Sequence, residues 1–261
     1  MLSINYKTVL KLVSRSVLGL VLTGTAMLTQ AEPLTVAVAA NVKFAFADLQ
    51  QAFTRQTGIE VKSVSGSSGK LTAQIKNGAP FDIFLSANMK YPDALYQSGM
   101  AVTKPRVYAN GVLVLWTMNP LDLDKGIQVL NDPAVQKIAV ANPRLAPYGR
   151  EAINALKHFK LYPALESKLI YGENISQVSQ YIDSKSADIG FTAKSVVLAP
   201  QLAGQGKWVE LPGDSYRPIA QGVVILKHGA ETSPEAAHRF LEFLASPAAR
   251  SIFEKYGYLL P

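Results

Sequence analysis

Short apolar runs alternate with amphipathic helical patterns along the chain. Strands are predicted at residues 34–38, 59–64, 81–85, 112–116, 137–141, 168–171, 188–192 and 222–226. Helices are predicted where apolar residues recur at helical spacing, from Val42 to Gly58, around Leu71 and Ile75, and over 149–159, 175–184 and 234–244. Strands that are apolar almost throughout and separated by helices are typical of a parallel sheet covered on both faces. The pattern therefore predicts an α/β fold.

The alternation restarts after Gly111 with the very apolar run 112–116. The residues that follow position 31 could form one domain, but two lobes of about 110 residues each are nearer the usual domain size. No stretch rich in Gly, Ser or Pro separates the two halves. Two lobes without a flexible linker are expected to be joined by strands that hinge.

The first 31 residues have the composition of a secretory signal peptide. Lys7, Lys11 and Arg15 form a basic segment, and residues 16–31 carry no charge and end in small residues. The apolar part is shorter than the roughly 20 residues that span a membrane comfortably. We therefore predict a cleaved signal peptide at residues 1–31, rather than an uncleaved membrane anchor, and a periplasmic protein.

Removing this leader changes the charge of the chain. The leader holds three of the 26 Lys and Arg residues and none of the 19 Asp and Glu residues, so the formal net charge falls from +7 to +4. The remaining basic residues are scattered singly, which argues against nucleic acid as a partner. Cysteine is absent, and a chain of this length can bury a core without disulfides.

Two short polar turns each follow a predicted strand and open a predicted helix. They are Ala-Ala-Asn at residues 39–41 and Ser-Gly-Ser-Ser-Gly at residues 65–69. The first N–H groups of a helix lack internal partners and lie at the positive end of the helix dipole, so such turns can bind anions. Parallel strands bring both helix starts to one edge of the sheet. The pair of turns therefore predicts an anion receptor, although either turn alone would be an ordinary helix cap.

Catalytic motifs are incomplete in this chain. The Gly-Lys pair at residues 69–70 ends like a phosphate-binding loop, but Val64 and Leu71 stand where that motif needs Gly and Ser or Thr. No Gly-x-Ser-x-Gly elbow surrounds Ser67 or Ser68. The three histidines are far apart and have no carboxylate at metal-ligand spacing. We therefore expect neither an enzyme nor a site for a directly coordinated metal cation.

A set of motifs follows in order along nearly the whole chain after the leader. They are Val-Ala-Val-Ala-Ala-Asn at 36–41, Ser-Gly-Ser-Ser-Gly-Lys-Leu-Thr-Ala-Gln-Ile at 65–75, Asn-Gly-Ala-Pro-Phe-Asp at 77–82, Phe-Leu-Ser-Ala at 84–87, Asn-Pro-Arg-Leu-Ala-Pro-Tyr-Gly at 142–149, Ser-Pro-Ala-Ala-Arg-Ser-Ile-Phe at 246–253 and Tyr-Gly-Tyr at 256–258. Together these motifs resemble the periplasmic molybdate-binding proteins of ABC importers.

The resemblance implies a two-lobed periplasmic binding protein fold of type II. Each lobe would be a mainly parallel sheet flanked by helices, and the two lobes would close on one tetrahedral oxyanion. Lobe 1 would comprise residues 32–111 and 220–261, and lobe 2 residues 112–219. An ABC permease in the inner membrane would recognise the closed form.

The resemblance also implies the ligand set. The residues carried over are Ala40, Asn41, Ser68, Tyr148 and Ile175, the last two as backbone donors. Many family members have a tyrosine hydroxyl ligand where this chain has Ala193. Either Asn41 supplies the lost donor, or the site is weaker or differently selective.

None of these residues is charged, which suits a fully deprotonated dianion, because such an ion accepts hydrogen bonds only. A protonated phosphate would need an acceptor, usually a carboxylate. We expect molybdate and tungstate both to bind to a monomer without any cofactor. Three alternatives stay open. The protein could be a receptor for another tetrahedral oxyanion such as sulfate or thiosulfate, a receptor for ferric iron or a small organic acid, or a secreted hydrolase that uses Ser67 or Ser68.

Overall fold

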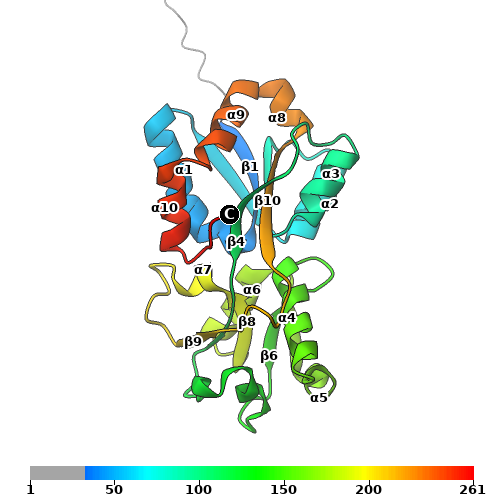
Figure 1. Ribbon diagram of the computed structural model, residues 1–261, viewed down its shortest axis with the longest axis vertical. Helices are drawn as coiled ribbons and strands as arrows, with labels where there is room; N and C mark the ends of the chain where they lie inside the picture. Colours follow the sequence, from blue (N-terminus) through cyan, green and yellow to red (C-terminus); the bar gives the residue numbers. More distant parts are fainter. Residues whose placement is uncertain (1–32) are drawn as a thin grey trace, which may run out of the picture. The chain divides into compact units, whose positions relative to one another are not determined.

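Ten strands of the part that the structure describes form two separate five-stranded sheets (Figure 1). The structure is a computed structural model and describes residues 33–261. Its strands include all the predicted apolar runs, and the α/β class is confirmed. The predicted signal peptide lies outside the described residues. Within residues 33–261, no helix combines the length and the apolar character that a membrane span requires.

The first sheet has the strand order β2-β1-β3-β10-β4. Its strands are β1 (Leu34–Ala39), β2 (Val61–Gly66), β3 (Ile83–Ser86), β4 (Arg106–Gly111) and β10 (Ile219–Ile225). Strand β1 runs parallel to β2 and β3, whereas β10 is antiparallel to both of its neighbours. Because β1 lies inside the sheet and is buried along almost its whole length, its sequence is apolar without alternation.

The second sheet has the order β7-β6-β8-β5-β9. Its strands are β5 (Leu113–Thr117), β6 (Ile138–Ala141), β7 (Leu169–Gly172), β8 (Ile189–Ala193) and β9 (Lys207–Glu210). Strand β6 is parallel to β7 and β8, and β5 is antiparallel to β8 and β9. The reversed strand of each sheet, β5 or β10, is the strand that the chain enters directly after leaving the other sheet. Each sheet is therefore mainly parallel with one reversed strand.

Helices flank both sheets. Those that follow or precede strands of the first sheet are η1 (Ala40–Val42), α1 (Lys43–Thr57), α2 (Ser68–Lys76), α3 (Lys90–Gln97), α8 (Lys227–Thr232), α9 (Pro234–Phe243) and α10 (Pro247–Lys255). Those that lie between strands of the second sheet are η2 (Leu123–Asn131), α4 (Pro147–His158), α5 (Tyr162–Leu165), η3 (Glu166–Lys168), α6 (Ile175–Asp183) and α7 (Lys194–Val197).

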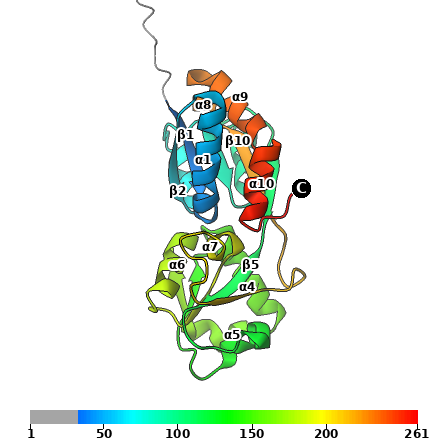
Figure 2. The same cartoon turned by 90° about the vertical axis from the view of Figure 1, so that its left-hand side faces the viewer.

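Helices α1 and α10 lie side by side against the first sheet (Figure 2). Helix α1 buries one face and ends at Gly58, whose φ of 73° is the left-handed conformation that glycine adopts most easily. The Phe53 ring of α1 lies 5.0 Å from the Phe240 ring of α9. Lys255 of α10 pairs with Asp48 of α1 at 2.8 Å. Helix α1, early in the chain, is thus tied to α9 and α10 near its end by aromatic packing and one ion pair.

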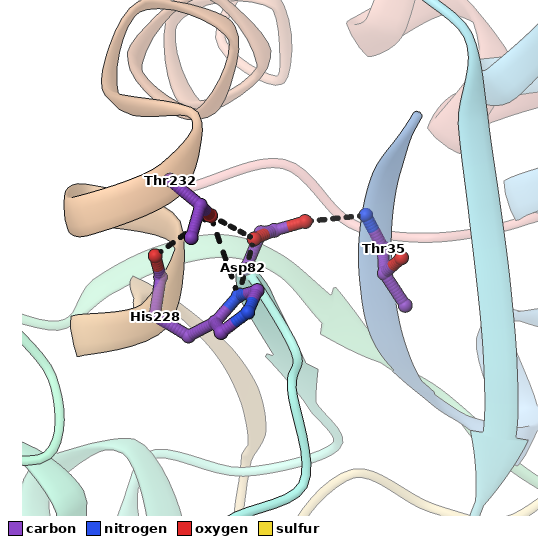
Figure 3. A network of polar contacts seen from close by, with 4 residues as sticks. All are labelled: Thr35, Asp82, His228 and Thr232. Carbon is purple, nitrogen blue, oxygen red and sulfur yellow. Dashed lines mark hydrogen bonds and ion pairs between the residues drawn. The ribbon is translucent and has the colours of Figure 1, made fainter. Parts of the chain in front are cut away.

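A buried carboxylate fixes α8 to the first sheet (Figure 3). Asp82, just before β3, accepts from the Thr35 N–H at 2.6 Å and lies 2.8 Å from His228 Nδ1, and the Thr232 hydroxyl donates to it at 3.3 Å. A Cβ atom at Gly229 would approach the Asp82 carbonyl oxygen to 2.5 Å, so glycine permits this close packing. The contact between Asp82 and His228 therefore has a structural role, which is to hold α8 against the first sheet. Within residues 33–261, no group of three His, Cys, Asp or Glu side chains is placed to hold a metal ion.

Candidate functional site

Four helix starts converge on one small cavity. These are the starts of η1 (which continues into α1), α2, α4 and α6. They follow the carboxyl ends of the parallel strands β1, β2, β6 and β7, respectively. The cavity has a volume of about 10 Å³, the space that one water-sized group occupies by the same measure. Its lining residues are Ala39, Ala40, Asn41, Gly66, Ser67, Ser68, Ala87, Ala146, Pro147, Tyr148, Asn174 and Ile175. Turns that follow strands of both sheets therefore contribute to one site.

The backbone at each helix start explains why donors face this cavity. Asn41, Ser68, Tyr148 and Ile175 all lie in the first turn of their helices, where N–H groups have no partner within the helix. Pro147 occupies the first position of α4, which is a favoured place for proline because its missing N–H is not needed there. Four positive helix ends thus meet at one point, which favours a bound anion.

The structure brings all five predicted ligand residues to this cavity. Ala40, Asn41 and Ser68 come from the first sheet's turns, and Tyr148 and Ile175 come from the second sheet's turns. Their part in binding stays a prediction. Asn174, which is not among the predicted ligands, also lines the cavity and caps α6 by accepting from the Gln177 N–H at 3.1 Å. An Asn directly before a helical pattern was the available signal for it.

The two neighbouring serines have different hydrogen bonds. The Ser67 hydroxyl oxygen accepts from the Lys70 N–H at 3.4 Å, so Ser67 caps α2. The Ser68 hydroxyl oxygen accepts from the Ala87 N–H at 3.0 Å, and Ala87 also lines the cavity. Because this bond occupies an acceptor position of the Ser68 oxygen, the hydroxyl proton remains available to an acceptor in the cavity. The Ser67 oxygen likewise only accepts, so the family resemblance, and not these hydrogen bonds, makes Ser68 the predicted side-chain donor.

Asn41 is held by residues far away in the sequence. Its side-chain amide nitrogen donates to Gln221 Oε1 at 2.8 Å and to the Tyr258 hydroxyl at 3.2 Å. The backbone carbonyl oxygen of Asn41 accepts from the Ser195 hydroxyl at 2.8 Å and from the Tyr258 hydroxyl at 2.9 Å. Both amide hydrogens of the side chain are thus used within the protein. The donor that this turn offers to an anion is its backbone N–H.

Ala193, where the family resemblance implies a tyrosine ligand, ends β8 and is fully buried. It is not among the residues that line the cavity. Both hydrogens of the Asn41 side-chain amide are paired within the protein. The backbone donors and the Ser68 hydroxyl are the donor set that the geometry leaves.

The side chain of Tyr148 extends away from its helix start toward the point where the chain leaves the first sheet. A Cβ atom at Gly111 would collide with the Tyr148 hydroxyl, so the two groups touch. The hydroxyl is buried and has no hydrogen-bond partner among the described residues. Burial raises the pKa of Tyr148 well above its usual value, so the hydroxyl stays neutral. The part of Tyr148 that suits an anion is its backbone N–H.

Tyr148→Phe is therefore expected to leave the affinity for a bound oxyanion within about threefold of the wild type and to keep or slightly raise thermal stability, because an unpaired buried hydroxyl contributes little. Calorimetric titration and a thermal melt measure both. A loss of affinity above tenfold would mean that the hydroxyl contacts the anion.

Charge is absent from the cavity wall. None of the lining residues is Lys, Arg, His, Asp or Glu. The nearby buried tyrosines add no charge, because burial raises the pKa of Tyr258 to about 12 and that of Tyr108 well above its usual value. The site thus offers neutral N–H and O–H donors at helix starts and no carboxylate acceptor. This arrangement suits an ion that only accepts hydrogen bonds.

Comparison with known proteins agrees with this geometry. The family of bacterial extracellular solute-binding proteins matches residues 34–259. The molybdate-binding protein ModA of Rhodobacter capsulatus is 39% identical over 238 residues, which are 90% of this chain and 92% of that protein. The ModA protein of Azotobacter vinelandii is 38% identical over 235 residues, covering 89% and 92% of the two chains.

Solved structures give the same result. The periplasmic molybdate-binding protein of Azotobacter vinelandii superposes with a TM-score of 0.81 at 34% identity, covering 87% of this chain and 99% of that one. The sulfate-binding protein SubI of Mycobacterium tuberculosis has a TM-score of 0.68 at 14% identity, covering 87% and 86%, which shows a shared fold. The chain therefore belongs to the bacterial extracellular solute-binding proteins, within the family of the molybdate-binding proteins ModA.

Proposed function

We propose that this protein captures molybdate in the periplasm and delivers it to the permease of an ABC transporter. One observation carries the proposal: four helix starts from two sheets meet at a small cavity without charged side chains, in a chain 39% identical to a molybdate-binding protein. Molybdate is a tetrahedral dianion at neutral pH and accepts hydrogen bonds only. Neutral donors at helix ends can hold such an ion without a charged partner.

The proposed donors are the backbone N–H groups of Ala40 and Asn41, the Ser68 hydroxyl with its backbone N–H, and the backbone N–H groups of Tyr148 and Ile175. No cofactor and no coordinated metal cation is needed, because the molybdenum would arrive inside its oxyanion. A phosphate that still carries a proton would need an acceptor, and the cavity wall offers no carboxylate. This chemistry favours molybdate and tungstate over phosphate.

The proposed mechanism is closure of two lobes around the anion. Lobe 1 would comprise residues 32–111 and 220–261, and lobe 2 residues 112–219. The first boundary lies between β4 and β5, where the chain leaves the first sheet. The second lies one residue inside β10, where the chain has just returned from β9. Each lobe contributes two helix starts, so only the closed form completes the donor set, and the anion shifts the equilibrium toward it.

The remaining parts of the proposal follow from this mechanism. A protein that binds its solute and releases it unchanged to a permease is not an enzyme. We propose that it works as a monomer after removal of residues 1–31, without nucleic acid or another macromolecule besides the permease. Tungstate is expected to bind as well, because it has the charge and nearly the size of molybdate.

Calorimetric titration of anion-free protein with molybdate, tungstate, sulfate and phosphate tests the proposal. We expect one-to-one binding of molybdate and tungstate, with sulfate at least about a hundredfold weaker, or roughly 3 kcal/mol. Equal binding of sulfate would indicate a general oxyanion receptor, and no binding of any anion would refute the function. Incubation with ester substrates provides a separate test, in which turnover would support a hydrolase.

A further inference from the structure

Three contacts join the two sheets' elements immediately outside the cavity. The Gly69 N–H on α2 donates to the Leu145 carbonyl before α4 at 2.9 Å. Lys70 Nζ lies 3.0 Å from Glu173 Oε2, and the Tyr91 hydroxyl of α3 donates to the Leu145 carbonyl at 3.4 Å. These residues adjoin the cavity wall, because Gly69 and Lys70 directly follow Ser68, and Glu173 directly precedes Asn174.

The contact with Leu145, and not the backbone conformation, explains why position 69 is glycine. Its φ is not positive, so an L-residue could adopt the same backbone. However, a Cβ atom at Gly69 would lie 2.9 Å from the Leu145 carbonyl oxygen, 2.9 Å from the Tyr91 hydroxyl and 3.0 Å from the Leu145 Cα. These distances are at or below the closest that real Cβ atoms reach. Glycine therefore lets α2 touch the loop before α4.

The ion pair lies beside this backbone contact. The side chains of Lys70 and Glu173 are 50% and 37% exposed, so water screens their attraction. Each belongs to a different lobe, and the pair would separate when the lobes move apart. In an open form Lys70 would carry an unpaired positive charge next to the Ser68 turn, which would attract an incoming oxyanion.

We propose that Gly69 and Lys70, with Leu145, Tyr91 and Glu173, form a latch that holds the closed lobes together and sets the rate at which the anion leaves. This inference rests on the proposed function. The latch residues act through the closed state, because none of them lines the cavity. The reason for the latch is geometric: the backbone hydrogen bond and the ion pair can form only when both lobes are in place.

Gly69→Ala separates the latch from folding. Alanine is a better helix former than glycine, so the anion-free variant is expected to melt at the same or a higher temperature. Closure would force the new Cβ onto the Leu145 carbonyl, so molybdate affinity should fall about tenfold or more. Calorimetric titration gives the affinity, and a chase of bound radiolabelled molybdate with unlabelled molybdate gives the release rate. We expect most of the loss in faster release.

Two further variants sharpen this test. Ala73→Gly changes the helix propensity of α2 at an exposed position, so it should lower stability and leave affinity unchanged. Adding Tyr91→Phe to Gly69→Ala removes one of the crowded atoms, the tyrosine hydroxyl, and should recover part of the affinity. Wild-type affinity and release in Gly69→Ala would overturn the latch.

The ion pair has its own matched control. Lys70→Ala and Glu173→Ala should each speed release about two- to fivefold, an effect that added salt reduces. The double variant should release no faster than the single ones, and the charge exchange Lys70→Glu with Glu173→Lys should slow release again. Lys76→Ala removes an exposed charge at the other end of α2 and should change nothing. If wild-type protein does not bind molybdate, the proposed function fails. If wild-type protein binds molybdate and the variants release it at the wild-type rate, only the latch proposal fails.

Discussion

Replacing Gly149 with alanine is expected to destabilise the protein by about 3 kcal/mol and to weaken molybdate binding at the same time. Gly149 is the third residue of α4 and follows Tyr148 directly. A Cβ atom there would collide with the carbonyl group of Ala141, the last residue of β6. The helix would have to move away from its strand, and the Tyr148 N–H would move with it. Folding and binding therefore depend on the same close approach.

Denaturant unfolding with and without molybdate measures both effects of Gly149→Ala. Helix propensity alone would favour alanine by up to about 1 kcal/mol, so the sign of the change decides which effect dominates. Gly213→Ala is the control, because a Cβ at Gly213 meets no atom within 4 Å. It should change stability by less than about 0.5 kcal/mol. A stabilised Gly149→Ala variant would contradict the packing of α4 on β6.

Ser68→Ala is expected to weaken molybdate binding by about 1–3 kcal/mol, which is roughly ten- to a hundredfold. The alanine removes the hydroxyl that we propose as a donor to the anion, so one anion oxygen would lose that donor. It also removes the acceptor of the Ala87 N–H, so a smaller loss of stability should accompany the loss of affinity. Calorimetric titration with molybdate gives the affinity, and thermal unfolding of the anion-free protein gives the stability.

Ser67→Ala is the matched comparison, because it is the same change one residue earlier. Ser67 caps α2, so its removal should cost about 1 kcal/mol of stability. Its effect on affinity should be several times smaller than that of Ser68→Ala. Equal affinity losses in both variants would mean that the helix start, and not the Ser68 hydroxyl, binds the anion.

Local sequence was sufficient for most elements of the fold. The strands of the core were predicted because β1, β3, β5, β6 and β8 are buried and each contains at most one Ser or Thr among apolar residues. Strands β4 and β9 were missed. Strand β9 is the outer strand of its sheet and reads Lys-Trp-Val-Glu, and β4 begins with an exposed arginine, so neither has an apolar run. Edge positions remove the burial that makes a strand visible in sequence.

The candidate site could also be predicted to a large extent, but for two different reasons. The turns at residues 39–41 and 65–69 were found from helix-start chemistry, because capping residues and the first unpaired N–H groups are local features. Tyr148 and Ile175 came from the family resemblance alone. The four turns meet because each follows a parallel strand, and parallel strands end at one edge of their sheet.

By itself, the sequence determined eight of the ten described strands, five of the helices and the two first-sheet helix starts, because these depend on neighbours only a few positions away. Only the tertiary structure decided what each side chain does. Asn41 pairs with Gln221 and Tyr258, which lie 180 and 217 positions further along the chain. The Gly69 contact with Leu145 likewise exists only because α2 of the first sheet meets the loop before α4 of the second. Hydrogen bonds between distant segments follow from packing, which no local pattern encodes.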